Sequence, residues 1–391
     1  MVCKMKGHPR GNYWGLGFVW VLAGPLCFLT LPGYCSLLLL VWVLGWSYVV
    51  LGRKGEMLEM CGRSVLITGS DTGFGHALAK KLYDKGVTVF AGVLDVKSPG
   101  AVELRRRGGG SWGGGGTGGG ESAGGGKGTG GELHVLQLDV TDHEQIQQAH
   151  QYICSHVGET GLWGVVNNAG ILGYVADGEI LPLRVYRQCL AVNFLGAVDV
   201  CQVFLPLLRR SRGRVVNVCS MAGDVPIPWF AAYAASKAAL IRFSGVMRLE
   251  LARWGIQVAI VQPAGFRTCI FGSSEEWNRC QEEILTNLSN DAREDYGEDY
   301  ISSIQNCFAS MVNRSEEDLG PVLDVLCHAL MSPAPRPLYS PGQCGWLIPF
   351  LHRHCPTKLY DVIITSLFQF DGCYTPHGLQ KNVCSINSEI S

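Results

Sequence analysis

The sequence has little charge. Charged residues make up 17% of its 391 positions, against roughly 25% in typical soluble domains. The 32 lysines and arginines almost cancel the 33 aspartates and glutamates. Such a balance supplies no basic surface for phosphates, so we expect no nucleic-acid partner.

Metal-binding patterns are also missing. The 16 cysteines include no Cys-x-x-Cys pair, and no cysteines and histidines cluster at the spacing that zinc sites use. Their density is too low for a disulfide scaffold in a chain of this length. We therefore expect no metal, and we interpret most of the cysteines as small buried side chains in a reducing compartment.

A long stretch near the N-terminus, from Gly11 to Gly52, has no charged side chain. Residues 1–12 form a basic lead, and residues 13–51 predict a membrane anchor. The anchor divides at Pro32-Gly33 into two halves, each about as long as a helix that spans a bilayer. Two passes would place both basic flanks and the main domain in the cytosol. A signal peptide, or a single pass with a lumenal domain, is the alternative.

The remainder of the chain divides into three parts. Residues 61–330 predict one α/β domain. Residues 331–373 contain apolar stretches too short to span a bilayer, which predict helices lying on the membrane or on the domain itself. Residues 374–391 form a polar tail.

Apolar runs alternate with amphipathic segments in residues 61–330. Ser64–Thr68 and Val87–Leu94 predict buried strands, and His76–Lys85 predicts a helix between them. This alternation is typical of a doubly wound parallel sheet, the Rossmann fold.

A glycine-rich loop joins the first predicted strand to the first helix. It reads Thr68-Gly-Ser-Asp-Thr-Gly-Phe-Gly75. Gly69, Gly73 and Gly75 carry no Cβ atoms that would keep a pyrophosphate from the backbone, and the first N–H groups of the helix face that anion. Between a strand and a helix, this spacing predicts a dinucleotide site.

The second predicted strand ends in Asp95, 20 residues after Gly75. A carboxylate at this position accepts hydrogen bonds from the adenosine ribose and repels a 2′-phosphate, which favours NAD over NADP. Asp139, at the end of the third strand, is a candidate for the adenine side of the pocket. A helix-capping role of Asp139 with Thr141 is the alternative.

Residues 107–131 form a low-complexity insert. Of the 24 residues from Gly108 to Gly131, 16 are glycine. Glycine loses the most entropy on ordering and buries nothing, so we expect a disordered surface loop.

Tyr233 and Lys237 are one helical turn apart, so the ammonium lies beside the phenol. A free phenol has a pKa of about 10, and a neighbouring cation lowers it. Tyr233 would then exchange a proton with an alcohol or ketone. Taken alone, such a pair is also frequent in purely structural helices.

Further polar motifs follow or end the later predicted strands. Asn167-Asn-Ala-Gly170 follows one predicted strand, Ser220 ends another, and Asn193 lies between them. With the glycine loop, Tyr233 and Lys237, they resemble the short-chain dehydrogenase/reductase family in order and spacing. The segment Pro263-Ala-Gly-Phe-Arg-Thr268 departs from the family only in Ala264, where glycine is usual.

The resemblance implies roles for these residues. Tyr233 is the catalytic base in oxidation, Ser220 binds the reacting oxygen, Lys237 binds the nicotinamide ribose and lowers the phenol pKa, and Asn193 holds the water of a proton relay. The implied cofactor is NAD. The implied cofactor-binding residues are Thr68, Gly69, Gly73, Phe74, Gly75, Asp95, Asp139, Asn167, Ala169, Gly170, Tyr233, Lys237, Pro263 and Thr268.

A narrower likeness covers about residues 60–350. Gly161-Leu-Trp-Gly and Asp295-Tyr-Gly-Glu-Asp-Tyr300, after an apolar N-terminus, are similar to the type 2 17-beta-hydroxysteroid dehydrogenases of this family. The likeness implies NAD-dependent oxidation of the 17-beta-hydroxyl of steroids such as estradiol and testosterone, in the endoplasmic reticulum membrane with a cytosolic catalytic domain. Oxidation of 11-beta-hydroxysteroids or all-trans-retinol, and a catalytically inactive lipid-binding relative, are the alternatives. The likeness leaves undecided whether the protein forms a homodimer.

The predicted substrate site surrounds the reacting oxygen with apolar side chains. Its residues are Ser220, Tyr233, Trp229, Phe230 and Phe266. A place in the plain core is an equal alternative for Trp229 and Phe230. The acidic segment Glu275–Tyr300 predicts the solvated outside of a lid.

Overall fold

The computed structural model describes residues 37–45, 57–109, 131–368 and 374–379. The chain divides into two units, Met1–Glu56 and Met57–Ser391. In the first unit, residues 37–45 form a helix whose leucines are largely exposed, Leu38 at 67%. The rest of the predicted anchor, and most of the insert 107–131, lie outside the described residues.

A seven-stranded sheet forms the centre of the second unit, in the order β3-β2-β1-β4-β5-β6-β7. All strand pairings are parallel. The strands are β1 (Ser64–Ile67), β2 (Thr88–Val93), β3 (Leu133–Gln137), β4 (Gly164–Asn167), β5 (Arg214–Val218), β6 (Gln257–Val261) and β7 (Leu338–Tyr339). The predicted doubly wound fold is thereby confirmed, and its order reverses between β1 and β4, where such sheets bind their ligands.

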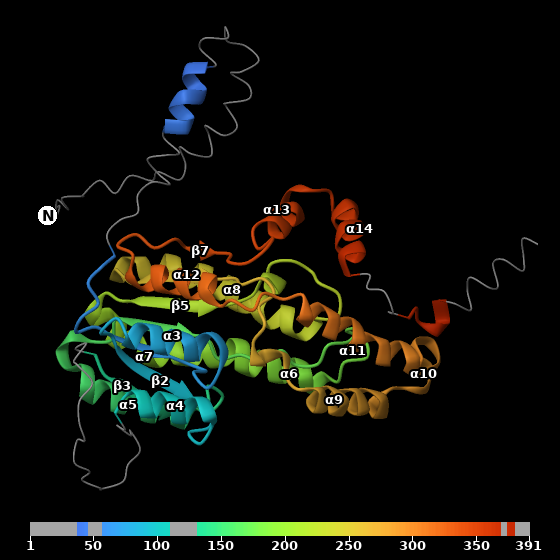
Figure 1. Cartoon of the computed structure of the whole chain (residues 1–391), viewed down its shortest axis with the longest axis horizontal. Coiled ribbons are helices and arrows are strands. Elements are labelled where there is room, and N and C mark those ends of the chain that lie inside the picture. Colours follow the sequence, from blue (N-terminus) through green and yellow to red (C-terminus); the bar gives the residue numbers. More distant parts are fainter. Residues whose placement is uncertain (1–36, 46–56, 110–130, 369–373, 380–391) are drawn as a thin grey trace, which may run out of the picture. The chain divides into compact units, whose positions relative to one another are not determined.

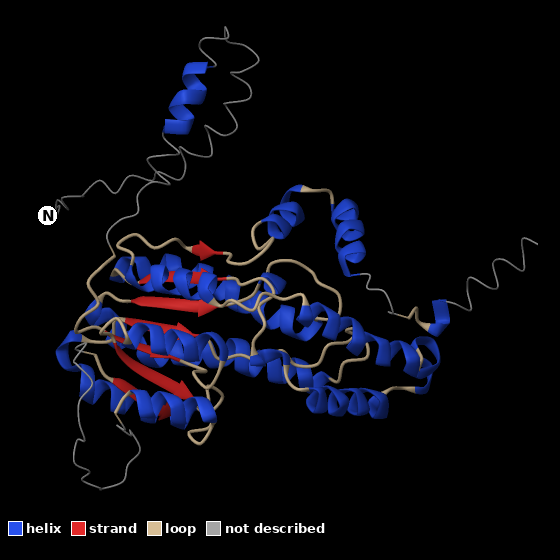
Figure 2. Ribbon diagram, in the orientation of Figure 1, coloured by secondary structure: helices blue, strands red, loops and turns tan. Residues whose placement is uncertain are grey.

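Helices cover both faces of the sheet (Figures 1 and 2). In β1, Val65 and Ile67 belong to one apolar cluster and Leu66 to the other, as the alternation of side chains along a strand requires. The first cluster includes residues of α3 (Gly73–Tyr83), α4 (Pro99–Arg107) and α12 (Gly320–Met331). The second includes residues of α5 (His143–Val157), α7 (Ala197–Ser211) and α8 (Ala231–Leu251).

Within the described part of the chain, one helical run is long and apolar enough to cross a membrane, Leu183–Ser211. It consists of α6 (Leu183–Leu190), a π-helical turn (Ala191–Gly196) and α7. Val200 and Phe204 in this run are 0% exposed and pack beside the sheet. The run is therefore a core helix of the domain.

Three helices after β6 form a separate layer, α9 (Ser274–Asn287), α10 (Asn290–Tyr296) and α11 (Glu298–Asn313). A capping box of Ser273 and Glu276 begins α9. The buried faces of α9 and α11 share an apolar cluster with Tyr233 and with the segment 171–181. We call this layer the lid.

Two helices end the described domain, α13 (Leu347–His354) and α14 (Thr357–Phe368). Tyr360 and Ile364 of α14 are buried against Val225, so one face of this helix lies on the domain. The opposite side exposes Val362 at 63%, and Phe350 of α13 is 50% exposed. Contact of these helices with a membrane stays a prediction.

Candidate active site

The glycine loop packs tightly against the segment after β4. Gly69 and Gly73 have φ angles of +65° and +59°, where glycine is the least strained residue. A Cβ atom on Gly69 would lie 2.7 Å from the Cα atom of Ala169, and one on Gly75 would lie 2.3 Å from the carbonyl oxygen of Gly69. Side chains at Gly69 and Gly75 would therefore push the loop away from β4.

Thr68 and Asn168 hold the two segments together. The Thr68 hydroxyl accepts hydrogen bonds from the N–H groups of Asn168 and Ala169, each at 3.0 Å. The Asn168 amide donates to the carbonyl oxygens of Thr68 and Gly69 at 3.0 and 2.9 Å. Thr68 therefore supports the cofactor site by fixing the conformation of the glycine loop. Asn168 does the same, although it was not among the site residues predicted from the sequence.

The start of α3 is open to an anion. The helix begins inside the glycine loop at Gly73, three residues before the predicted start, and Thr72 caps it without a side-chain hydrogen bond. By contrast, the side chains of Ser98 and Asp142 cap α4 and α5. Uncapped N–H groups at a helix start suit a pyrophosphate, so the chain's own geometry fits a dinucleotide.

The two predicted adenosine-side carboxylates differ in environment. Asp95 is exposed, and its Oδ1 accepts a hydrogen bond from the N–H of Lys97 at 2.8 Å. Asp139 Oδ1 accepts from the N–H and the hydroxyl of Thr141 at 2.8 and 2.7 Å. The N-cap of α5 is Asp142, so the helix-capping alternative for Asp139 with Thr141 is wrong.

The side chain of Asn167 lies in the interior of the sheet. Its side chain is 3% exposed and donates to Asn217 Oδ1 at 2.8 Å and to Cys201 Sγ at 3.2 Å. These contacts lie between neighbouring strands and α7, away from the glycine loop. The side chain therefore joins β4 to β5, and a role of Asn167 at the cofactor stays a prediction.

Asn193 lies in the π-helical turn with its amide fully engaged. Oδ1 accepts from the N–H of Ile171 at 2.8 Å, and Nδ2 donates to the Ile171 carbonyl at 2.8 Å and to Ser236 Oγ at 2.9 Å. Ser236 in turn donates to the carbonyl of Tyr233 at 2.7 Å. A relay water at Asn193 must therefore bind its main-chain carbonyl. Ser236 has no signature in the sequence, because a serine inside a helix belongs to no motif.

Gly170 brings this turn close to the predicted catalytic lysine. A Cβ atom on Gly170 would lie 3.1 Å from Asn193 Oδ1 and 3.2 Å from Lys237 Nζ. Lys237 is 3% exposed, and its ammonium donates to the Val218 carbonyl at 3.0 Å. An ammonium has three N–H groups, so two remain for ligands of the site.

Burial governs the titration of the Tyr233 phenol. It raises the pKa of Tyr233 to about 12, and the hydroxyl of Ser220 opposes that shift. Burial also lowers the pKa of Lys237, whose Nζ lies 5.8 Å from the centre of the Tyr233 ring. Lys237 is not among the groups that shift the pKa of this phenol, so its acidifying effect on Tyr233 stays a prediction.

Ser220 follows β5 by two residues and caps a short 3-10 turn, Met221–Gly223, where its Oγ accepts the N–H of Ala222 at 3.2 Å. The turn is held against the next strand because the N–H of Met221 donates to the Pro263 carbonyl at 3.1 Å. Thr268, later in the same loop, lies beside the glycine loop, since a Cβ on Gly73 would be 3.4 Å from it. Ser220, Pro263 and Thr268 thus meet at one edge of the sheet.

The three predicted substrate aromatics do not share one environment. Phe230 is 7% exposed in the cluster of Tyr233, and its ring centre lies 6.0 Å from that of Phe308 in the lid. Trp229 adjoins the same cluster with a φ angle of 69°. Phe266 is 3% exposed in the cluster of α3 and α12, with Phe74 at 5.8 Å.

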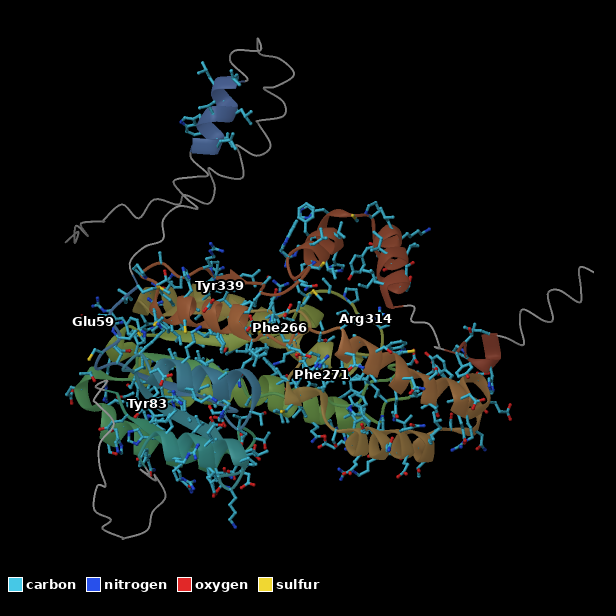
Figure 3. All side chains as sticks on the ribbon, in the orientation of Figure 1. Glu59, Tyr83, Phe266, Phe271, Arg314 and Tyr339 are labelled. Carbon is cyan, nitrogen blue, oxygen red and sulfur yellow. The ribbon has the colours of Figure 1, made fainter. Side chains whose placement is uncertain are left out.

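This placement argues against the predicted substrate contact of Phe266. The same loop reaches the Tyr233 cluster later, at Phe271, whose ring centre lies 5.6 Å from that of Phe308. Figure 3 labels Phe266 and Phe271. Phe74, predicted at the cofactor, packs on Phe266 in the first cluster.

Known proteins resemble this chain over most of its length. The family model of the short chain dehydrogenases matches residues 123–279. Estradiol 17-beta-dehydrogenase 2 of Mus musculus is 42% identical over 366 residues, which are 94% of this chain and 90% of that protein. The 11-beta-hydroxysteroid dehydrogenase type 2 of Bos taurus is 39% identical over 342 residues, 87% of this chain and 79% of that protein.

A solved structure resembles the fold. It is a short-chain dehydrogenase from Streptomyces avermitilis, with a TM-score of 0.55 and 24% identity, covering 78% of this chain and 96% of that one. At this identity the likeness shows the fold alone.

Proposed function

The chain belongs to the short-chain dehydrogenase family, and from this premise we propose that it is an NAD-dependent oxidoreductase for the 17-beta-hydroxyl of steroids. One observation carries the proposal: Tyr233 and Lys237 are buried beside Ser220 at the edge of a large apolar cluster. A rigid apolar alcohol needs such surroundings with few polar groups. The 42% identity to estradiol 17-beta-dehydrogenase 2 of Mus musculus supports the choice of steroid.

The residues that would hold the dinucleotide come from four places in the fold. They are the loop at Gly69 and Gly73, the carboxylate of Asp95, the free N–H groups of Lys237, and the loop at Thr268. When bound, the oxidised nicotinamide supplies the acceptor for the hydride that leaves the alcohol carbon.

Side chains of the protein carry out the proton transfer. Tyr233 takes the hydroxyl proton of the alcohol, and Ser220 donates a hydrogen bond to the oxygen on which negative charge develops. The phenol pKa of about 12 leaves Tyr233 protonated at neutral pH. Lys237 and Ser220 must therefore stabilise the phenolate when the site is occupied, which is the work of charge and hydrogen bonding near an ionised oxygen.

Membrane attachment is part of the same proposal. Residues 13–51 anchor the chain in the endoplasmic reticulum membrane, with the unit Met57–Ser391 in the cytosol. An apolar substrate that partitions into the bilayer then reaches the enzyme from the membrane. The exposed leucines of residues 37–45 support the anchor.

A substrate panel on membranes that carry the full chain tests the proposal. Estradiol, testosterone, cortisol and all-trans-retinol are each supplied with NAD and with NADP, and the reduced nucleotide is measured. We expect oxidation of estradiol and testosterone with NAD. Oxidation of cortisol alone would favour the 11-beta reaction, which the 39% identity to the Bos taurus enzyme makes the second candidate.

Tyr233→Phe tests the assigned base. Removal of one hydroxyl should lower kcat by about 100-fold to 10,000-fold, the usual contribution of general acid–base catalysis, and leave NADH binding intact. Tyr152→Phe is the control, because its hydroxyl pairs with His134 Nδ1 in the other apolar layer. Equal activity of the two variants would show that Tyr233 is not the catalytic base.

A further inference from the structure

Asp71 joins two loops that are far apart in the sequence. It lies in the glycine loop, and its carboxylate accepts hydrogen bonds from the loop after β2. Leu94 N–H donates to Oδ2 at 2.9 Å, Asp95 N–H donates to Oδ1 at 3.2 Å, and the Ser98 hydroxyl donates to Oδ1 at 3.3 Å. One carboxylate thus binds three donors of the segment that carries the predicted ribose ligand.

The backbone around Asp71 packs closely against the loop after β2. A Cβ atom on Gly100, in the first turn of α4, would lie 1.8 Å from the Asp71 carbonyl oxygen. The N–H of Ser70 donates to the Gly92 carbonyl at 2.8 Å. A change in the Asp71 side chain would therefore release the Leu94–Ser98 segment without displacing β2.

The position of Asp95 depends on this link. Its own N–H is held by Asp71, its carbonyl accepts the N–H of Ser98 at 3.0 Å, and its Oδ1 accepts the N–H of Lys97. The Asp71 carboxylate binds the backbone N–H of Asp95, so both residues place a negative charge near the end of β2. Negative charges near a bound nucleotide disfavour a further anion such as a 2′-phosphate.

We propose that Asp71 is a positioning and specificity-determining residue for the dinucleotide, which holds the Asp95 segment in place and adds the second negative charge that disfavours a 2′-phosphate. The inference rests on the dinucleotide part of the proposed function and is independent of the substrate. It assigns to the glycine loop a role in choosing between the two nucleotides, in addition to its approach to the pyrophosphate.

Nucleotide binding to the full chain in detergent micelles tests this role. The dissociation constants of NADH and NADPH are measured by nucleotide fluorescence for the wild type and for Asp71→Asn. An amide offers one acceptor oxygen and presents N–H groups to donors, so we expect NADH to bind about tenfold more weakly. The preference for NADH over NADPH should fall by about tenfold or more.

Two further variants separate position from charge. Asp71→Glu keeps the charge but displaces the loop by one methylene, so NADH binding should weaken while the preference for NADH stays within about threefold of the wild type. Asp84→Asn is the matched control, because Asp84 pairs with Arg107 at the other end of α3. It removes the same charge and should change neither constant.

An unchanged preference in Asp71→Asn, equal to that of Asp84→Asn, would overturn the inference. If Asp71→Asn does not fold, Ser98→Gly carries the test, since it removes one donor and glycine is tolerated as an N-cap. Because it keeps the charge of Asp71, we expect it to weaken NADH binding a few-fold while the preference stays within about threefold of the wild type, and an unchanged affinity for NADH would again overturn the inference. Wild-type protein that binds neither nucleotide would contradict both proposals, whereas NADH binding without steroid oxidation would count against the substrate alone.

Discussion

Buried polar side chains at the site are held by partners from several elements. Asn193 binds both backbone groups of Ile171 and the hydroxyl of Ser236. Ser236 also fixes the carbonyl of Tyr233. A hydroxyl in the middle of α8 thus links the π-helical turn to the residue assigned as the base. Such a residue positions the site without touching the substrate.

Ser236→Ala should therefore lower activity as well as stability. A matched control lies on the same helix: Ser244 is also 0% exposed, accepts from the amide of Asn217 at 2.7 Å and donates to the Leu240 carbonyl at 2.6 Å. Both alanine variants should lose about 1–3 kcal/mol of unfolding free energy, because each leaves one buried amide N–H without its acceptor.

Only Ser236→Ala should lower kcat, by about tenfold, the equivalent of 1.4 kcal/mol in the barrier. Thermal unfolding and steady-state rates are measured for both variants. Equal kcat values would show that Ser236 has a structural role alone.

At the scale of elements, tyrosine hydroxyls fasten the lid to the segment after β4. Tyr300 donates to Asp177 at 2.6 Å, Tyr296 to Glu179 at 2.8 Å, and Tyr174 to Glu283 at 2.7 Å. Arg184 also pairs with Glu283. Tyr233 beneath the lid is 9% exposed. Because the phenol is buried beneath the lid, we expect a substrate alcohol to reach it only when the lid opens.

The bond between Tyr300 and Asp177 should contribute more than the others to closure. Tyr300 is 7% exposed, and burial raises the pKa of Asp177, so this carboxyl has lost water that the exposed Glu179 retains. We expect Tyr300→Phe to speed amide exchange in α11 and in residues 176–180 by about tenfold.

Tyr296→Phe is the comparison, and it should change exchange little because water replaces its partner. Hydrogen exchange followed by mass spectrometry measures both variants. The same exchange in the two variants would contradict the ranking of the two bonds.

At the scale of the whole molecule, apolar surface is concentrated outside the sheet. The helix at residues 37–45 exposes most of its leucines, and α13 and α14 expose Phe350 at 50% and Val362 at 63%. Exposed apolar side chains of this number are costly in water. The chain therefore has two regions that a bilayer would stabilise.

Removal of residues 1–56 should make the protein extractable from membranes at alkaline pH, whereas the full chain should resist extraction. The division of the chain after Glu56 leads us to expect NADH affinity within about twofold of the full chain. Sedimentation of carbonate-washed membranes measures the first effect and nucleotide fluorescence the second. If the truncated chain still resisted alkaline extraction, α13 and α14 would be the segments that attach the protein to the membrane.

Topology is tested in the same membranes. The chain has sequons at Asn287 and Asn313, both exposed at the ends of lid helices. A cytosolic domain leaves them unmodified, so endoglycosidase treatment should not change the mobility of the full chain. A mobility shift would place the domain in the lumen.

The sequence alone predicts three features of the protein. These are the alternation of strands and helices, the glycine loop, and the spacing of Tyr233 and Lys237. These features depend on neighbours a few residues apart: glycine where a Cβ would collide, apolar runs where a strand is buried on both faces, and one helical turn between two side chains. Local sequence determines such features, and the parallel sheet follows from their order.

Tertiary structure decided which way the polar side chains of these motifs face. Asn167 and Asn168 are neighbours, yet strand alternation sends the first to Asn217 and the second to the glycine loop. Phe266 and Phe271 share a loop and enter different apolar clusters. The phenol pKa of Tyr233 is set by burial under elements more than 60 residues away, such as Phe308. Contacts between distant segments fix orientation and desolvation, and a linear pattern contains neither.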